Sequence, residues 1–85
     1  DKWSPLMIGQ LVGEALTFSD LEKRLAGISP RTLSARLEKL QEDDIIEKLR
    51  YNEHPPRYKY VLTDKGRGLI DILESMAAWG EKYHS

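Results

Sequence analysis

The sequence contains no cysteine among its 85 residues. This absence excludes disulfide bonds, thiolate metal sites and cysteine-based redox sensing within the chain, and it is compatible with the cytosol. No apolar run approaches the roughly 20 residues that a membrane-spanning helix needs, and no signal peptide precedes the first predicted helix. We therefore expect a cytoplasmic protein without a membrane anchor, and at this length a single domain covering residues 1–85.

Signatures of catalysis are missing as well. The only histidines, His54 and His84, do not stand at the spacing of metal ligands, and the sequence has neither a glycine-rich phosphate loop nor a nucleophile elbow. The acidic run 42–44 is expected to end a helix and to be solvated rather than to form an acid–base pair. We therefore expect no enzyme activity, no metal site and no cofactor.

The formal net charge is only −1, which is not the profile of a general nucleic-acid binder. The distribution of charge is more informative than its sum. Residues 28–37 carry Arg31 and Arg36 without an acid, and residues 48–59 carry one acid, Glu53. The cations of this second segment are Lys48, Arg50, Arg57 and Lys59. Two central segments therefore concentrate positive charge; the alternative is an ordinary mixed surface.

The N-terminal half shows the start and stop signals of three helices. In "SPLMIGQLVGEAL", Ser4 suits the N-cap, and the following proline suits the first helical position. In "TFSDLEKRLAGIS", Ser19 and Glu22 have the spacing of a capping box, and Gly27 can adopt the left-handed conformation that ends a helix. A third helix starts with Ser29 as its cap. Two capped helices around a glycine-containing turn predict a helix-turn-helix over about residues 19–43.

The third helix has a clear apolar face. Leu33, Leu37 and Leu40 follow a helical spacing and are expected to point into the core. The N-terminal half of the opposite face is polar and basic, whereas its C-terminal half is acidic. This polarity suits a helix whose N-terminal end approaches an anion.

Two strand-like segments follow, "IIEKLRY" and "YKYVL". The polar stretch between them contains Pro55 and Pro56, and because proline cannot donate a ladder hydrogen bond, the pair belongs at the tip of a hairpin. We expect this hairpin over about residues 45–62 and a short third strand at 16–18. Thr63 then caps a long helix at 64–83. The order of elements predicts a mostly α fold with a small β-hairpin (α+β), namely a winged helix-turn-helix.

The last predicted helix carries more apolar side chains than one contact face requires. The spare surface indicates a partner helix; the alternative is a small core that wraps fully around this helix. Trp3 and Trp79 are expected to pack in the core or at this contact rather than to form a ligand pocket. The predicted dimer interface comprises Trp3, Leu69, Ile72, Leu73, Met76, Trp79 and Tyr83.

The sequence resembles the HxlR-type winged helix-turn-helix transcriptional regulators, which are MarR-like. The resemblance rests on "DKWS", on "FSDLEKRLAGISPRTLSARLEKLQEDDII" and on "YNEHPPRYKYVLTDKG", and it covers nearly the whole chain. It implies a cytoplasmic prokaryotic DNA-binding regulator that acts as a homodimer. In this family a cysteine before the "KW" segment is common, and some members use it to sense oxidants or electrophiles; no such residue is present here. The family also commonly has glycine where this chain has Asp44, a residue type that still tolerates the left-handed conformation.

A helix-turn-helix reads DNA with the N-terminal residues of its second helix. The predicted DNA-binding residues of that helix are Ser29, Arg31, Thr32, Ala35 and Arg36. Arg31 or Arg36 could clamp a guanine base, worth about 1–3 kcal/mol of discrimination. The alternative for Arg36 is a local ion pair with Glu38 or Glu42.

The wing is expected to lie over DNA phosphates or the minor groove. Its predicted DNA-binding residues are Arg50, Arg57 and Lys59; Lys59, together with Lys48, is a weaker choice, since both could simply solvate the sheet. The competing interpretation is a winged-helix protein–protein interaction module that does not bind DNA and works through its last helix. The expected partners are double-stranded DNA and a second copy of the chain, and a small-molecule effector is left open.

Overall fold

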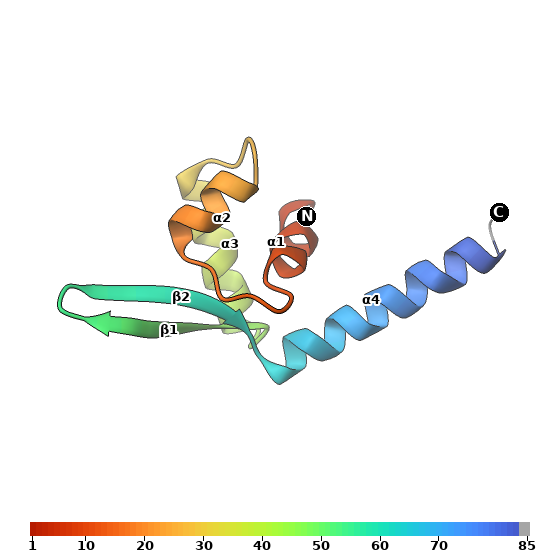
Figure 1. Cartoon of the computed structure of the whole chain (residues 1–85). Coiled ribbons are helices and arrows are strands. Elements are labelled where there is room, and N and C mark those ends of the chain that lie inside the picture. Colours follow the sequence, from red (N-terminus) through yellow and green to blue (C-terminus); the bar gives the residue numbers. More distant parts are fainter. Residues whose placement is uncertain (84–85) are drawn as a thin grey trace.

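The computed structural model describes residues 1–83, which form four helices and one antiparallel hairpin. The elements are α1 (Trp3–Gln10), α2 (Phe18–Arg24), α3 (Pro30–Glu42), β1 (Ile46–Glu53), β2 (Pro56–Leu62) and α4 (Asp64–Tyr83). Figure 1 shows α1, α2 and α3 gathered on one side of the hairpin, whereas α4 extends away from them. This arrangement confirms the predicted winged helix-turn-helix and its α+β class.

The start of α1 differs from the prediction that Ser4 is its cap. The carboxylate of Asp1 accepts hydrogen bonds from the backbone N–H groups of Trp3 (2.9 Å) and Ser4 (2.8 Å), and the Ser4 hydroxyl donates to the same carboxylate (2.9 Å). A carboxylate satisfies two free N–H groups at once and interacts favourably with the positive end of the helix. The predicted Ser4 cap is therefore wrong.

The capping box of α2 also lies elsewhere than predicted. Thr17 Oγ1 accepts from the backbone N–H of Asp20 (3.0 Å), and the Asp20 carboxylate accepts from the backbone N–H of Thr17 (3.0 Å). The predicted pair, Ser19 and Glu22, is therefore wrong, because a threonine two residues earlier makes the reciprocal contact with an equally suitable acid. Beyond the helix, Gly27 has a φ of 90°, which confirms the predicted left-handed turn between α2 and α3.

The predictions for α3 are confirmed. Ser29 Oγ accepts from the backbone N–H of Thr32 (3.1 Å), and proline occupies the first turn. Leu33, Leu37 and Leu40 are buried. After the helix, Asp44 has a φ of 59°, so it adopts the left-handed conformation.

The hairpin joins the helices at its base. Ile46 pairs with Leu62, Lys48 with Tyr60 and Arg50 with Tyr58, and a bulge follows between Arg50 and Asn52. The third strand predicted at 16–18 is a single bridge: Leu16 and Tyr60 exchange backbone hydrogen bonds of 3.1 and 2.7 Å. It extends no further because Phe18 already belongs to α2.

The hydrophobic core fills the space between α1, α2, α3 and the base of the hairpin. Its buried members are Met7, Ile8, Leu11, Leu16, Leu21, Leu25, Ile28, Leu33, Leu37, Leu40, Ile45, Ile46, Tyr60 and Leu62. Within the described residues, Gly66 is the only buried residue of α4. The alternative expectation, that the core wraps around the last helix, is therefore wrong.

A tight joint connects α4 to the end of α3. Thr63 Oγ1 accepts from the backbone N–H of Gly66 (3.0 Å), which confirms the predicted cap, and it donates to the carbonyl oxygen of Asp44 (2.6 Å). Lys65 Nζ donates to the carbonyl oxygen of Asp43 (2.8 Å). At Gly66 a Cβ atom would collide with the carbonyl oxygen of Ile45, so the backbones approach as closely as only glycine permits.

Candidate nucleic-acid interface

The N-terminal half of α3 presents an open polar face. Arg31 and Ala35 are exposed and lie on the side opposite Leu33 and Leu37. Within the described part of the chain, the side chain of Arg31 forms no ion pair and no hydrogen bond. Its guanidinium group therefore keeps all five N–H donors for another molecule.

Two hydroxyl groups mark the start of this face. Ser29 Oγ donates to Thr32 Oγ1 (2.9 Å) and accepts from the Thr32 backbone N–H. Ser29 is exposed, whereas Thr32 is half-buried. Both predicted residues thus lie at the N-terminal end of α3, with their hydroxyl groups engaged in the cap.

Arg36 lies on a different side of α3 from Arg31. The two residues are five positions apart in the helix, which corresponds to a rotation of about 140°. Arg36 is half-buried, and its Nε lies 3.7 Å from the carboxylate of Asp1, beyond hydrogen-bonding distance. The expected local partners do not pair with Arg36, because the acid that approaches it comes from the start of α1. Arg36 is therefore less accessible than Arg31.

A groove separates the helix-turn-helix from the wing. It has a volume of about 520 Å³ and is lined by Thr17, Phe18, Ser19, Ser34, Lys48, Tyr51, Pro56, Arg57, Tyr58 and Tyr60. The lining contains two cations, several hydroxyl groups and no acid. Ser19 and Ser34 were not among the predicted site residues, since their sequence signals, a helix start and an exposed α3 position, do not distinguish them from other polar residues.

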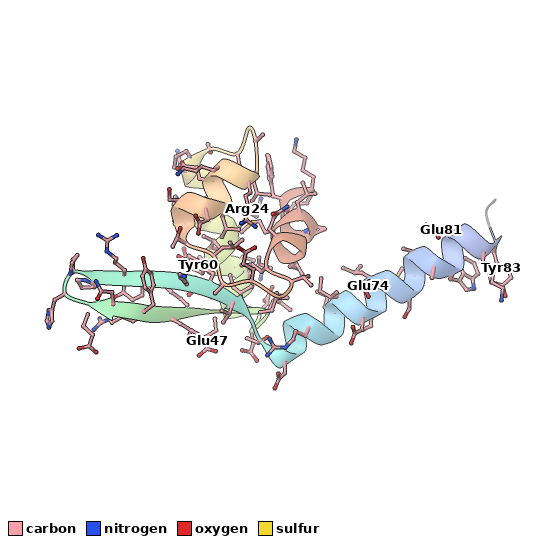
Figure 2. All side chains as sticks on the ribbon, viewed as in Figure 1. Arg24, Glu47, Tyr60, Glu74, Glu81 and Tyr83 are labelled. Carbon is pink, nitrogen blue, oxygen red and sulfur yellow. The ribbon has the colours of Figure 1, made fainter. Side chains whose placement is uncertain are left out.

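The two faces of the wing carry different cations. Directly paired residues of an antiparallel hairpin share a face, so Lys48 and Arg50 lie on the same face as Tyr58 and the buried Tyr60. Lys59 pairs with Leu49 and lies on the opposite face together with Glu47. Figure 2 shows Tyr60 on the side of the hairpin that faces the helices and Glu47 on the other side.

Three cations of the wing lie beside tyrosine rings. Lys48 Nζ lies 4.5 Å from the ring centroid of Tyr58, and the guanidinium carbon of Arg50 lies 5.6 Å from it. Arg50 also donates a hydrogen bond to the Tyr58 hydroxyl (3.2 Å). Lys59 Nζ lies 5.1 Å from the ring of Tyr51, which stands at the bulge of β1 and also lines the groove. These contacts have the geometry of cation–π interactions.

Arg57 stands near the tip of the wing. It is exposed, pairs with Asn52 beyond the bulge and lines the groove. Within the described residues its side chain forms no ion pair or hydrogen bond. Tyr60, deeper on the same strand, is buried in the core, and this burial raises the pKa of its phenol.

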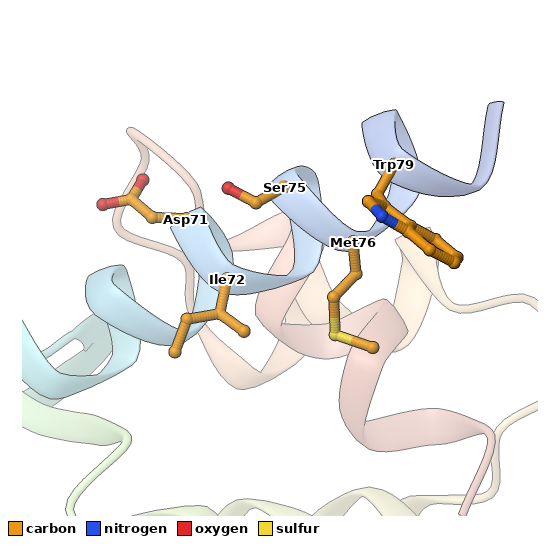
Figure 3. A pocket seen from close by; sticks show the side chains of 5 residues that line it. All are labelled: Asp71, Ile72, Ser75, Met76 and Trp79. Atoms are coloured by element: carbon orange, nitrogen blue, oxygen red, sulfur yellow. The ribbon is translucent and has the colours of Figure 1, made fainter. Parts of the chain in front are cut away.

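The apolar stripe of α4 is open to solvent. Its exposed members are Ile72, Leu73, Met76, Trp79 and Tyr83, with exposed fractions between 40% and 64%. A shallow hollow of about 490 Å³ lies along this stripe (Figure 3). Two other predicted interface residues, Trp3 and Leu69, are half-buried against the core of the same chain.

Neither a metal centre nor a membrane helix emerges from residues 1–83. In this part of the chain no group of three or more histidine, cysteine, aspartate or glutamate side chains could hold a metal ion. No helix described there is long and apolar enough to cross a bilayer. His54 is exposed at the tip of the wing, and His84 lies outside the described residues.

Comparison with known proteins places these features in a family. The family model described as HxlR-like helix-turn-helix matches residues 1–85. An uncharacterised HTH-type transcriptional regulator of Methanothermobacter thermautotrophicus is 37% identical over 84 residues, which cover 99% of this chain and 64% of that protein. The regulator YvaP of Bacillus subtilis is 34% identical over 82 residues, or 96% of this chain and 76% of YvaP.

Solved structures agree with this assignment. A MarR-family transcriptional regulator from Enterococcus faecalis V583 superimposes with a TM-score of 0.91 at 34% identity, covering 98% of this chain and 76% of that one. The reduced form of YodB from B. subtilis gives a TM-score of 0.87 at 29% identity, covering 98% and 81%. These relatives are transcriptional regulators and not enzymes. The chain belongs to the HxlR-like helix-turn-helix family of transcriptional regulators.

Proposed function

We propose that the chain is a sequence-specific, double-stranded DNA-binding regulator that acts as a homodimer in the cytoplasm. The observation that supports this function best is the unpaired Arg31 on the exposed face of α3, together with a groove between the helices and the wing whose lining has cations but no acid. A base-reading side chain and a phosphate-binding surface are the two parts that DNA recognition requires.

In this proposal α3 enters the major groove with its N-terminal end first. Arg31 donates two hydrogen bonds to a guanine, and Ala35 contacts a thymine methyl group. Ser29 and Thr32 lie where backbone N–H groups of the helix start can meet a phosphate. Arg36 contributes directly only if its guanidinium group leaves Asp1, so we assign it a secondary role.

The wing then lies on the DNA backbone or in the minor groove. Arg57 follows Pro55 and Pro56, the second of which begins β2, and because the prolines restrict the backbone there, little conformational entropy is lost on binding. Arg50 supplies further positive charge, whereas Lys59 lies on the opposite face of the hairpin and is assigned no direct contact with the DNA.

Homodimerisation would use the stripe on α4. A second copy would cover Ile72, Leu73, Met76, Trp79 and Tyr83. Trp3 and Leu69 would contribute only the parts of their side chains that the core of their own chain does not bury. A two-fold dimer places two α3 helices on two half-sites, so it predicts an operator with inverted symmetry.

A small-molecule effector is part of the proposal without an assigned site. One structural neighbour is described as the redox regulator HypR in its reduced form. Because the 85 residues contain no cysteine, an effector would not act by oxidising a thiol within them.

The exposed stripe of α4 favours one competing function, a protein–protein interaction module without DNA binding. Fluorescence anisotropy of a labelled mixed-sequence duplex, titrated with the chain at low and moderate salt, separates the two. A DNA-binding regulator gives an affinity that falls steeply as salt rises, because phosphate contacts release counterions. Absence of binding at low salt, from a protein shown to be folded and dimeric, would contradict the regulator and favour the interaction module.

A further inference from the structure

Tyr58 brings two cations together on one face of the wing. Its ring lies 4.5 Å from Lys48 Nζ and 5.6 Å from the Arg50 guanidinium carbon, and its hydroxyl accepts a hydrogen bond from Arg50. Two positive groups that share one ring are held near each other despite their repulsion. Such an arrangement is most favourable when an anion lies beside it.

This side of the wing faces α2 and α3 across the groove. Lys48 and Tyr58 line the groove of about 520 Å³ together with Ser34 of α3 and Ser19 of α2. Within residues 1–83 neither Lys48 nor Arg50 forms an ion pair. The groove therefore offers an uncompensated positive charge and hydroxyl donors, which matches the chemistry of a phosphodiester oxygen.

Arg50 and Lys48 both keep N–H donors that can bind a phosphate. Arg50 uses one N–H on the Tyr58 hydroxyl, and a guanidinium has five. Lys48 keeps three N–H donors while its charge rests over the ring. Because both side chains are already restrained, binding a phosphate orders them less than it would order two free side chains.

We infer that Lys48, Arg50 and Tyr58 form a phosphate-binding surface for the DNA backbone, in which Lys48 and Arg50 contact a phosphate and Tyr58 is a positioning residue. The inference rests on the proposed function and deepens it. It also separates two lysines of the wing: Lys48, which lines the groove, contacts the phosphate, whereas Lys59, which does not line the groove, makes no such contact.

Lys48→Gln and Lys59→Gln form a matched pair for the test. Both remove one positive charge, both lysines lie over a tyrosine ring, and both stand on the same hairpin on opposite faces. The probe is a fluorescent mixed-sequence duplex of about three helical turns, titrated at several salt concentrations. Lys48→Gln weakens binding about five- to tenfold near 0.1 M salt and lowers the slope of log K against log salt by about one per copy.

Lys59→Gln is expected to keep both the affinity, within about twofold, and the slope. Equal losses for the two variants would overturn the inference, because they would show that the wing contributes only general charge. If the unaltered chain shows no salt-dependent binding, the proposed function itself fails. The two failures are therefore distinguishable.

The role of Tyr58 is tested by a double-mutant cycle. Tyr58→Leu weakens DNA binding in the unaltered chain, but changes it less than about twofold when Lys48 and Arg50 are both glutamine. Tyr58→Phe keeps the ring and is expected to bind within about twofold of the unaltered chain. A residue that only packs the hairpin would cause the same loss in both backgrounds, and that result would overturn the positioning role.

Discussion

Thr63 Oγ1 donates a hydrogen bond to the carbonyl oxygen of Asp44 at 2.6 Å, and the same oxygen caps α4 by accepting from the Gly66 N–H at 3.0 Å. One hydroxyl group thus joins the end of α3 to the start of α4. Asp44 itself is in the left-handed conformation, with a φ of 59°. This joint fixes how α4 leaves the domain.

Thr63→Val tests the joint by removing the hydroxyl while keeping the shape. The variant loses a helix cap and leaves the Asp44 carbonyl without this donor, so we expect the free energy of unfolding to fall by about 1–3 kcal/mol. Urea denaturation followed by circular dichroism measures it. Thr63→Ser is the control, and a loss as large in Thr63→Ser would show that the hydroxyl is not responsible.

Gly66→Ala and Gly68→Ala should have opposite effects on stability. A Cβ at Gly66 would collide with the Ile45 carbonyl oxygen, so this variant is expected to lose about 1–3 kcal/mol. Gly68 has nothing within 4 Å of its ideal Cβ and lies inside α4, so alanine there should add about 0.5–1 kcal/mol. Thermal unfolding of the two variants gives the comparison, and a stabilised Gly66→Ala would disprove the close contact.

Arg31→Gln should change the specificity of DNA binding more than its general strength. If Arg31 clamps a guanine, its loss costs about 1–3 kcal/mol at one base position and relaxes the preference there. Arg57→Gln, by contrast, should weaken binding to every sequence alike and lower the salt slope by about one. The DNA affinity of each variant is measured by fluorescence anisotropy with a panel of duplexes that differ from the operator at a single base. Identical profiles for the two would refute the assignment of a base-reading role to Arg31.

Met76→Glu should dissociate the proposed homodimer. It places a charge in the middle of the exposed apolar stripe of α4, where a second copy would have to bury it. Ala78→Glu is the matched control, because it lies two residues on, about 200° around the helix and off the stripe. Sedimentation velocity should show a monomer for the first variant and a dimer for the second. A dimer in both would place the interface elsewhere.

The capping box of α2 makes a small contribution to acid sensitivity. Hydrogen bonds from Thr17, first of all from its backbone N–H, lower the pKa of Asp20 below its ordinary value of 3.8. Because the folded state lowers this pKa, the carboxylate stabilises the fold above pH 3.8, and this stabilisation is lost as the pH falls through the lower folded-state value. Melting temperatures of the unaltered chain and of Asp20→Asn should therefore converge in acid. A difference in melting temperature that stays the same at every pH would contradict this contribution of the Asp20 carboxylate.

Much of this fold could be predicted because its signals are local. The cap at Ser29, the leucine spacing of α3 and the prolines at the wing tip each act within a few residues. The two wrong caps show the limit of such signals, since several possible capping residues stand close together at both helix starts: Asp1 and Ser4 at α1, and Thr17, Ser19 and Asp20 at α2. Local spacing could not decide which of them the chain uses.

The candidate site was less predictable because its geometry depends on distant parts of the chain. The carboxylate beside Arg36 belongs to Asp1, 35 positions earlier. The separation of Lys48 from Lys59 depends on the register of β1 with β2, which the base of the hairpin sets against the core. Composition showed that the wing is basic, but only this register shows which of its cations face the helices.

The most direct test of sequence-specific DNA binding is a selection followed by a competition. Duplexes would be enriched from a random library by the unaltered chain, and the selected duplex would then compete with a scrambled one in an anisotropy titration. We predict a selected sequence with inverted half-sites that binds at least about a thousandfold more tightly than the scrambled duplex at physiological salt. Equal affinity for the two duplexes, from a folded dimer, would contradict a sequence-specific regulator.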